Sequence, residues 1–470
     1  MKKLKKIHLI GIGGAGMTSL ANLLISQGYK VLGSDIKESN NTRYLKEKGV
    51  KIFIGHRKEN IKGKEIVVYS AAVSQDNIEL KEAKRRKLKI YNRYEYLMEI
   101  LKDKKIIAVS GTHGKSTTST MVGFVLKKMN LNPTVYIGAT SKYFPYGSEW
   151  GKGEFAVVET DEHDKSFLLT PSYLPVILDV DNDHLAKDGP YKGRFSLLKK
   201  SFEEFEKVSN SGYSVLNIDD EFLNGLRKIS KNKVITFGLK NRKAHFRAVN
   251  LKFFPIYKKH LSQGEILYQN KSFSHFKFQL PGKENVLNLL ATLAVAKTLA
   301  LDIKKALRIL KDFPPIKRRF NVLYFSKNLA IIDDHADHPT EIKVSLRMIR
   351  QVLPGYKIFL VLQPHRYSRV SLLYKEYAKA IKDCDNLVLL PLDPASEKPI
   401  PNVDSKRIYE VIKKEKIKKE DKVLLFEREN NQKVLFEILK NIPCKKRAIV
   451  FMGPGKIASY APEFVKYLKN

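Results

Sequence analysis

The chain has 470 residues, enough for about three domains of roughly 150 residues each. Hydrophobic residues make up 43% of the chain, so each domain can bury its own core and a wholly disordered protein is excluded. No uninterrupted run of about 18 apolar residues occurs, and we therefore expect no membrane span. The 2 cysteines are too few for a disulfide framework and favour a reducing, cytoplasmic location.

The net charge of +37 comes from 86 Lys and Arg residues against 49 Asp and Glu residues. Such an excess suits a partner that carries phosphate groups. The lysines are spread along the whole chain, however, and no basic run alternates with aromatic residues as in a protein that binds single strands. This distribution is typical of a solvated, lysine-rich surface such as thermophilic proteins have, and we expect no nucleic-acid partner.

Strand-like apolar runs alternate with helical patterns along most of the chain, which predicts an α/β fold with mainly parallel sheets. Glycines interrupt the apolar run behind the N-terminal lysines, so we expect a first strand and helix there rather than a signal peptide. Residues 240–280 indicate shorter and more antiparallel strands, and a helix is expected at 285–301. The other predicted strands lie at 6–10, 30–33, 51–54, 65–69, 106–109, 156–158, 175–178, 329–332, 357–362, 386–390, 423–426 and 448–451.

These patterns divide the chain into three parts. A new strand series begins after residue 103, and the pair Pro314 and Pro315 indicates a linker before the last series. We therefore expect a Rossmann-like domain at 1–103, a P-loop ATPase-like domain at 104–313 and a second Rossmann-like domain at 314–470.

A glycine-rich segment follows the first predicted strand, with glycines at 11, 13, 14 and 16. In such a segment the peptide N–H groups at a helix N-terminus face a pyrophosphate. Asp35 ends the next strand, where a carboxylate can reach a ribose hydroxyl. NAD, FAD or a nucleotide sugar would fit this fingerprint, and a purely structural turn is the simpler alternative.

A second loop, GTHGKST at 111–117, lies between a predicted strand and an apolar helix. It is a shorter form of the phosphate loop, in which small residues let peptide N–H groups surround an anion. Lys115 would reach the β- and γ-phosphates, and the Ser116 hydroxyl would face Mg²⁺. The segment predicts ATP binding.

Two acidic clusters follow strands of the central part. Glu159, Asp161, Glu162 and Asp164 follow one strand, and the segment DVDNDH at 179–184 follows the next. Carboxylates at such strand ends can hold Mg²⁺ directly or through water. His184 is either a metal ligand or an ordinary histidine at the start of a helix.

The C-terminal part carries two polar segments behind apolar strands, DDHADHP at 333–339 and QPHRYSR at 363–369. Open α/β sheets bind ligands at this end of their strands. Arginine binds carboxylate or phosphate in a bidentate manner, so His365, Arg366 and Arg369 are candidate substrate residues.

Taken in order, these motifs resemble the Mur ligase family over essentially all 470 residues. The sequence carries the GTHGK loop, the acidic VETDE strand end, the DH pair, PG-x-x-N-x-x-N at 281–288, RRF at 318–320, DD-x-A-x-H-P and QPHRYSR. GIGGAGM, Arg93 within NRYEYLMEIL and QPHRYSR are similar to the alanine-adding branch of the family.

The resemblance implies a three-domain ATP-dependent ligase that joins the carboxylate of UDP-N-acetylmuramate to L-alanine through an acyl phosphate, in peptidoglycan synthesis. It implies ATP and Mg²⁺ as cofactors, small-molecule partners, and a monomer or homodimer whose domains close over the substrates. The residues implied for the UDP-sugar are Gly11, Gly13, Gly14, Ala15, Gly16, Met17, Asp35, Ser70 and Arg93. Those implied for ATP are Gly111, Thr112, His113, Gly114, Lys115, Ser116, Thr117, Asn285, Asn288 and Arg319. The amino acid and substrate are assigned to His365, Arg366, Tyr367 and Arg369, the metal to Ser116, Glu159 and His184, and catalysis to Lys115, His184, His338 and Arg366.

The sequence departs from the family pattern at several of these positions. Asp179 stands in place of asparagine, Glu284 in place of histidine, and Lys456 in place of an acid. Within DDHADHP, His335 replaces a tyrosine and Asp337 replaces the first of two histidines. The AAGE loop is reduced to ASE at 395–397. These changes keep open a different amino acid, peptide or UDP-sugar as substrate, or a catalytically weakened nucleotide-binding homologue.

Overall fold

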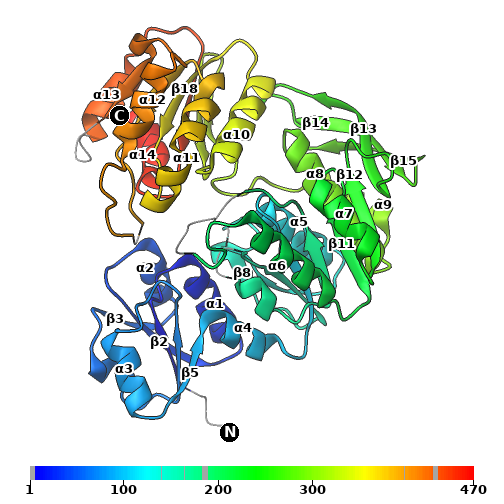
Figure 1. Ribbon diagram of the computed structural model, residues 1–470, viewed down its shortest axis with the longest axis vertical. Coiled ribbons are helices and arrows are strands. Elements are labelled where there is room, and N and C mark those ends of the chain that lie inside the picture. Colours follow the sequence, from blue (N-terminus) through cyan, green and yellow to red (C-terminus); the bar gives the residue numbers. More distant parts are fainter. Residues whose placement is uncertain are drawn as a thin grey trace.

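The computed structural model describes residues 6–138, 140–162, 165–182, 189–395, 397–426 and 432–469. Three α/β units follow one another along the chain (Figure 1). The blue N-terminal unit and the orange C-terminal unit both lie beside the central unit. This arrangement confirms the expected fold class, whereas the exact domain boundaries stay a prediction.

The N-terminal unit is a parallel sheet with strand order β3-β2-β1-β4-β5. Its strands are β1 (Lys6–Ile10), β2 (Lys30–Asp35), β3 (Lys51–Ile54), β4 (Ile66–Tyr69) and β5 (Lys89–Asn92). Its helices are α1 (Ala15–Ser26), α2 (Asn40–Glu47), the 3₁₀ turn η1 (Lys58–Ile61), α3 (Ile78–Arg85) and α4 (Arg93–Leu101). Asn92 and Glu95 form a reciprocal capping box that fixes the start of α4, and hence the position of Arg93.

The central unit has the strand order β15-β14-β13-β12-β11-β10-β6-β9-β7-β8. Its strands are β6 (Lys105–Ser110), β7 (Thr134–Tyr136), β8 (Ser148–Glu149), β9 (Phe155–Glu159), β10 (Leu174–Ile177), β11 (Tyr213–Asn217), β12 (Lys233–Gly238), β13 (Phe246–Phe253), β14 (Ser262–Tyr268) and β15 (Lys271–Phe278). Its helices are α5 (Lys115–Lys128), η2 (Pro145–Gly147), η3 (Ser166–Leu169), α6 (Phe195–Lys207), α7 (Glu221–Ile229), α8 (Lys283–Thr298) and α9 (Ile303–Leu310). The antiparallel pairing of β13 to β15 confirms that expectation. The expected shortness of these strands was wrong, since β13 and β15 have 8 residues each.

The C-terminal sheet has the order β16-β17-β21-β18-β19-β20, with β16 antiparallel at one edge. Its strands are β16 (Asn321–Phe325), β17 (Leu329–Asp334), β18 (Lys357–Leu362), β19 (Asn386–Leu389), β20 (Val423–Leu425) and β21 (Arg447–Met452). Its helices are α10 (Pro339–Val352), α11 (Tyr367–Ala380), η4 (Ile381–Asp383), α12 (Ser405–Lys414), η5 (Glu420–Lys422), α13 (Gln432–Lys440) and α14 (Ile457–Tyr467). No helix within the described ranges is long and apolar enough to cross a membrane.

Two apolar cores cover the faces of the central sheet. One packs α5, α8 and α9 against the sheet. The other is continuous with the core of the N-terminal unit, and runs from Leu97 of α4 to Ala108 of β6 and Phe202 of α6. Because this second core is shared, apolar burial fixes the N-terminal unit against the central one.

Candidate functional site

The first glycine loop is held from inside by the end of β2. The peptide N–H groups of Gly11 and Ile12 both donate to the carbonyl of Ser34, and Gly11 adopts a positive φ of 77°. Asp35 was expected to face a ribose. Its Oδ2 instead accepts the N–H of Gly13 at 2.8 Å, and its Oδ1 accepts the N–H of Ile36. The carboxylate therefore shapes the loop from which α1 starts.

Arg93 lies directly above Gly16, so close that a Cβ on Gly16 would sit 1.5 Å from the guanidinium Nη1. This nitrogen donates to the hydroxyl of Tyr136, 3.3 Å away, and that hydroxyl donates to the carbonyl of Gly16. Tyr136 belongs to β7 of the central unit, and the sequence reasoning missed it. Ser70 borders the same loop, with its Cβ 3.2 Å from where a Cβ on Gly11 would be.

The second loop joins β6 to α5 and repeats this construction. The peptide N–H of His113 donates to the Asp179 carboxylate at 2.8 Å, and the hydroxyl of Thr112 accepts the N–H of Asp181. Gly111 and Gly114 have positive φ values of 136° and 80°, which side chains rarely tolerate. The loop thus presents the N-terminus of a 14-residue helix, which attracts anions.

The side chain of Lys115 is 13% exposed and already paired. Its Nζ donates to the carbonyl of Gly111 at 2.7 Å and to the carboxylate of Glu162 at 2.9 Å. Burial alone would lower the pKa of Lys115, but the neighbouring carboxylates of Glu162, Asp161 and Glu159 outweigh it and raise that pKa. The lysine is therefore charged and directed at the loop.

Ser116 and Glu159 bring together the oxygen atoms that Mg²⁺ prefers. The Ser116 hydroxyl donates to Glu159 Oε1 at 2.9 Å, and Glu159 Oε2 accepts the N–H of Gly138. A hydroxyl and a carboxylate beside a phosphate loop fit that ion well. His184, the third expected metal residue, lies outside the described residues.

Helix α8 brings two amides to the loop. Asn288 Oδ1 accepts the hydroxyl of Thr118 at 3.1 Å and lies 2.6 Å from where a Cβ on Gly114 would be. The Asn285 amide donates to the carbonyl of Pro281, which orients it at the start of the helix. Both asparagines line the cavity described below, as does Glu284.

The two arginines of the RRF segment make different contacts. Arg318 pairs with Asp333 at 3.3 Å and donates to the carbonyls of Gly453 and Pro454, so it ties the segment to the C-terminal sheet. Arg319 instead points into the cavity, where its Nη1 lies 3.4 Å from Glu341 Oε1. Glu341 is a cavity residue that the sequence reasoning did not find.

The two C-terminal polar segments meet at Asp337. Its carboxylate forms an ion pair with Arg369, and its Oδ2 lies 3.3 Å from Nδ1 of His365. Burial would raise the pKa of Asp337, but Arg369 and His365 hold it well below its usual range. Arg366 and Tyr367 lie at the start of α11, where the Arg366 N–H donates to the carbonyl of Asp393.

A cavity of about 380 Å³ lies between the central and C-terminal units. The loop at 112–117, Glu159 and α8 form one wall, and Arg319, residues 334–338, Glu341 and Arg369 form the other. Of the expected ATP residues, all but Gly111 line the cavity, whereas His365, Arg366 and the first glycine loop do not.

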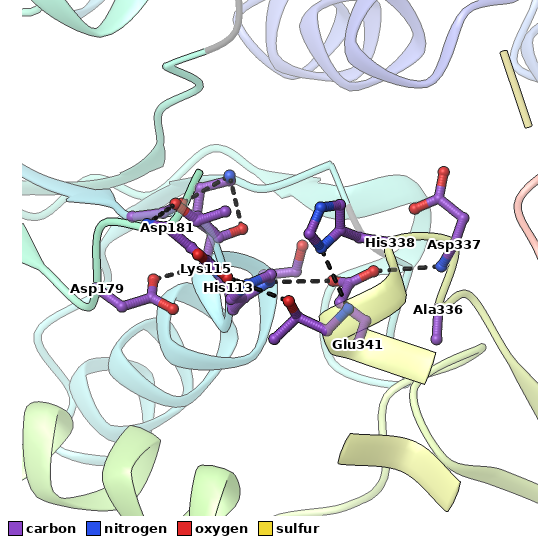
Figure 2. Close-up of polar contacts among 12 residues, drawn as sticks. His113, Lys115, Asp179, Asp181, Ala336, Asp337, His338 and Glu341 are labelled. Carbon is purple, nitrogen blue, oxygen red and sulfur yellow. Dashed lines mark hydrogen bonds and ion pairs between the residues drawn. The ribbon is translucent and has the colours of Figure 1, made fainter. Parts of the chain in front are cut away.

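Polar contacts bridge the two walls (Figure 2). Asp181 Oδ2 accepts the hydroxyl of Thr340 at 3.2 Å and lies 3.3 Å from Nε2 of His113. Nδ1 of His113 lies 3.9 Å from Glu341 Oε1. Burial alone would lower the pKa of His113, but the acids around it raise that pKa well above its ordinary value. His338 caps α10 by accepting the N–H of Thr340.

Comparison with known proteins gives matches to three family models that together span most of the chain. "Mur ligase family, catalytic domain" matches residues 6–105, "Mur ligase middle domain" matches 109–296, and "Mur ligase, glutamate ligase domain" matches 318–455. A curated UDP-N-acetylmuramate–L-alanine ligase of Aquifex aeolicus is 38% identical over 470 residues, which cover 99% of this chain and 98% of the relative. A curated UDP-N-acetylmuramate–L-alanine ligase of Caldicellulosiruptor saccharolyticus is 40% identical over 416 residues, which cover 87% of this chain and 89% of the relative. The crystal structure of UDP-N-acetylmuramate-alanine ligase MurC from Thermotoga maritima superimposes with a TM-score of 0.82 at 28% identity, covering 99% of both chains.

Proposed function

Because the chain belongs to the Mur ligase family, we propose that it joins the carboxylate of UDP-N-acetylmuramate to the amine of L-alanine at the expense of ATP. The observation that carries this proposal is the cavity in which a phosphate loop with a charged lysine faces Arg319 of the next domain. The chain would act in peptidoglycan precursor synthesis in the cytoplasm, with small-molecule substrates, as a monomer or homodimer.

In this proposal the loop at 111–117 holds the phosphates of ATP through its peptide N–H groups. Lys115 would leave Glu162 for the β- and γ-phosphates, and Arg319 would neutralise charge from the opposite wall. Asn285 and Asn288 would contact the nucleotide. Ser116 and Glu159, with His184, would hold Mg²⁺, which when bound supplies positive charge to the phosphates.

The UDP-sugar would lie at the first glycine loop, with its diphosphate over Gly13 to Gly16 and Arg93 beside it. The sugar carboxylate would attack the γ-phosphate of ATP, which gives an acyl phosphate and releases ADP. The amine of the amino acid would then attack the acyl carbonyl carbon, so that the amide forms and inorganic phosphate leaves. His365, Arg366 and Arg369 would hold the substrate and the amino acid. The proposed catalytic set consists of Lys115, His184, Arg366 and His338. Positioning and charge neutralisation would supply most of the catalysis.

Two departures from the family pattern, Asp179 and Asp337, differ in their consequences. Asp179 accepts the N–H of His113 through one oxygen, as an asparagine side chain also can. Asp337 is different, because it neutralises Arg369 and so removes one free positive charge from the expected substrate region. This ion pair favours the second candidate, a family ligase for another amino acid or peptide.

The decisive experiment is phosphate release from ATP and Mg²⁺ with UDP-N-acetylmuramate and each amino acid in turn. We expect release only when the sugar nucleotide and L-alanine are both present. Release with another amino acid instead would support the second candidate and direct attention to Asp337. Binding of ATP without release in any mixture would overturn the ligase proposal for this sugar nucleotide.

A further inference from the structure

Three potential metal ligands from two domains converge at the edge of the cavity. His113 comes from the phosphate loop, Asp181 from the segment after β10, and His338 from the start of α10 (Figure 2). We propose that His113, Asp181 and His338 bind a divalent transition-metal ion of the Zn²⁺ type. This site is separate from the Mg²⁺ position beside Ser116 and Glu159, and the proposal does not depend on the identity of the ligase substrates.

The spacing of the ligands suits such an ion. Each residue offers one ligand atom, and the three atoms lie within 4.8 Å of one another. In a tetrahedral zinc site with bonds of about 2.0 Å, neighbouring ligand atoms are separated by roughly 3.3 Å. His113 Nε2 and Asp181 Oδ2 already stand at 3.3 Å, so a small approach of His338 would complete the site.

The chemistry of the ligands selects the ion. Two imidazoles and one carboxylate resemble the three-ligand sites that leave a fourth position open to water or substrate. Imidazole nitrogen suits Zn²⁺, Co²⁺ or Ni²⁺, whereas Mg²⁺ is bound mainly through oxygen atoms. The Mg²⁺ position offers the oxygens of Ser116 and Glu159, and the proposed His184 would add one imidazole there against two in the new site, so the two positions should discriminate between the two kinds of cation.

Neighbouring groups orient these ligands as outer-shell partners do in known metal sites. Glu341 Oε1 faces the second nitrogen of His113 at 3.9 Å, and the hydroxyl of Thr340 donates to Asp181. The N–H of Thr340 lies 3.3 Å from Nδ1 of His338. Coordination through Nε2 of His338 would place the ring proton on Nδ1, and the hydrogen bond from Thr340 would give way to the metal–nitrogen bond.

A metal ion at this position would join the phosphate loop to helix α10. Asp181 and Glu341 supply negative charge there, while Lys115 and Arg319 are engaged with Glu162 and Glu341. Because the ligands come from the central and the C-terminal domains, the ion would hold these two domains together at the edge of the cavity.

The test is Co²⁺ binding to the full-length protein in a large excess of Mg²⁺, followed by the visible absorption of four-coordinate cobalt. We expect one Co²⁺ per chain and displacement of the cobalt by Zn²⁺. Asp181→Asn and His338→Asn, on different domains, should each abolish the visible band, and Glu341→Gln should weaken Co²⁺ affinity by about 10- to 100-fold. His275→Asn removes an exposed histidine of β15 and should leave the band unchanged.

Absence of the cobalt band in the wild-type protein would overturn the proposal. So would a band that persists in both Asp181→Asn and His338→Asn when circular dichroism shows them folded. If one variant fails to fold, the other still decides the outcome, because each removes a ligand from a separate element.

Discussion

The two glycine loops of this protein share a scaffold and differ in what they add to it. In each, a carboxylate from a following strand end accepts a loop N–H at 2.8 Å, Asp35 for Gly13 and Asp179 for His113. The first loop has the guanidinium of Arg93 beside Gly16. The second adds Lys115, already paired with Glu162, and a facing wall of charged side chains from another domain. We therefore expect the second loop to depend more strongly on charged side chains than the first.

The strongest test of this contrast is Lys115→Gln. Because the second loop acts through charge, loss of the ammonium should lower kcat/KM for ATP by about 10²- to 10³-fold, as removal of one electrostatic stabiliser does in other enzymes. Steady-state kinetics with varied ATP would measure it. Lys128→Gln, at the exposed end of the same helix, is the control. A drop below about 10-fold would mean that the loop backbone alone carries the phosphates.

An intermediate effect is expected from Gly16→Ala, because its methyl group would displace the Arg93 guanidinium. Loss of a hydrogen bond to a charged group is worth about 1.5–3 kcal/mol, so the KM for UDP-N-acetylmuramate should rise by about 10- to 100-fold. The KM for ATP should stay unchanged. Gly225→Ala, on helix α7 with open space around it, controls for the added methyl group. An equal rise in both KM values would contradict the separation of the two loops.

The smallest expected effect is on stability, and it concerns His335, which lies among the charged side chains that face the second loop. Burial, aided by Arg319 and Arg318, lowers the pKa of His335 from 6.5 to about 4. On acidification the unfolded chain therefore takes up this proton first, which favours unfolding as the pH falls. Between about pH 7 and about pH 5 this histidine should remove about 2 kcal/mol from the free energy of unfolding.

His335→Tyr, which gives the residue found in the family pattern, should abolish that part of the acid sensitivity. Urea denaturation at the two pH values would measure the difference between variant and wild type. His275→Tyr, at an exposed position, should behave as the wild type. Equal pH dependence of His335→Tyr and wild type would show that the ring stays hydrated.

Much of the fold could be read from the sequence because parallel strands buried on both faces appear as continuous apolar runs. The predicted strands at 106–109 and 357–362 fall within β6 and β18 for this reason. The length of β13 and β15 was not predicted, because these strands pair as an antiparallel ribbon whose half-exposed residues break the apolar pattern.

Site residues could be predicted from the sequence only where they belong to one continuous motif. Both glycine loops are continuous segments, and their residue types alone indicate anion binding. Tyr136 escaped because it meets Arg93 across a domain boundary, and Glu341 escaped because it meets Arg319, 22 residues away in the sequence, only in the folded chain. The ion pair between Asp337 and Arg369 escaped for the same reason, since its members are 32 residues apart and meet only through the sheet.

The anchoring of Arg318 has a consequence for building hybrid proteins. Phe313 and Ile316 pack in the core of the central unit, whereas Phe320 packs in the core of the C-terminal one. Arg318 and Phe320 have positive φ values, and the Arg318 side chain is tied to the far end of β21. A graft of the C-terminal unit from a relative should therefore be joined at residue 317, so that the incoming arginine, its strand-end carbonyls and its aspartate come from one parent.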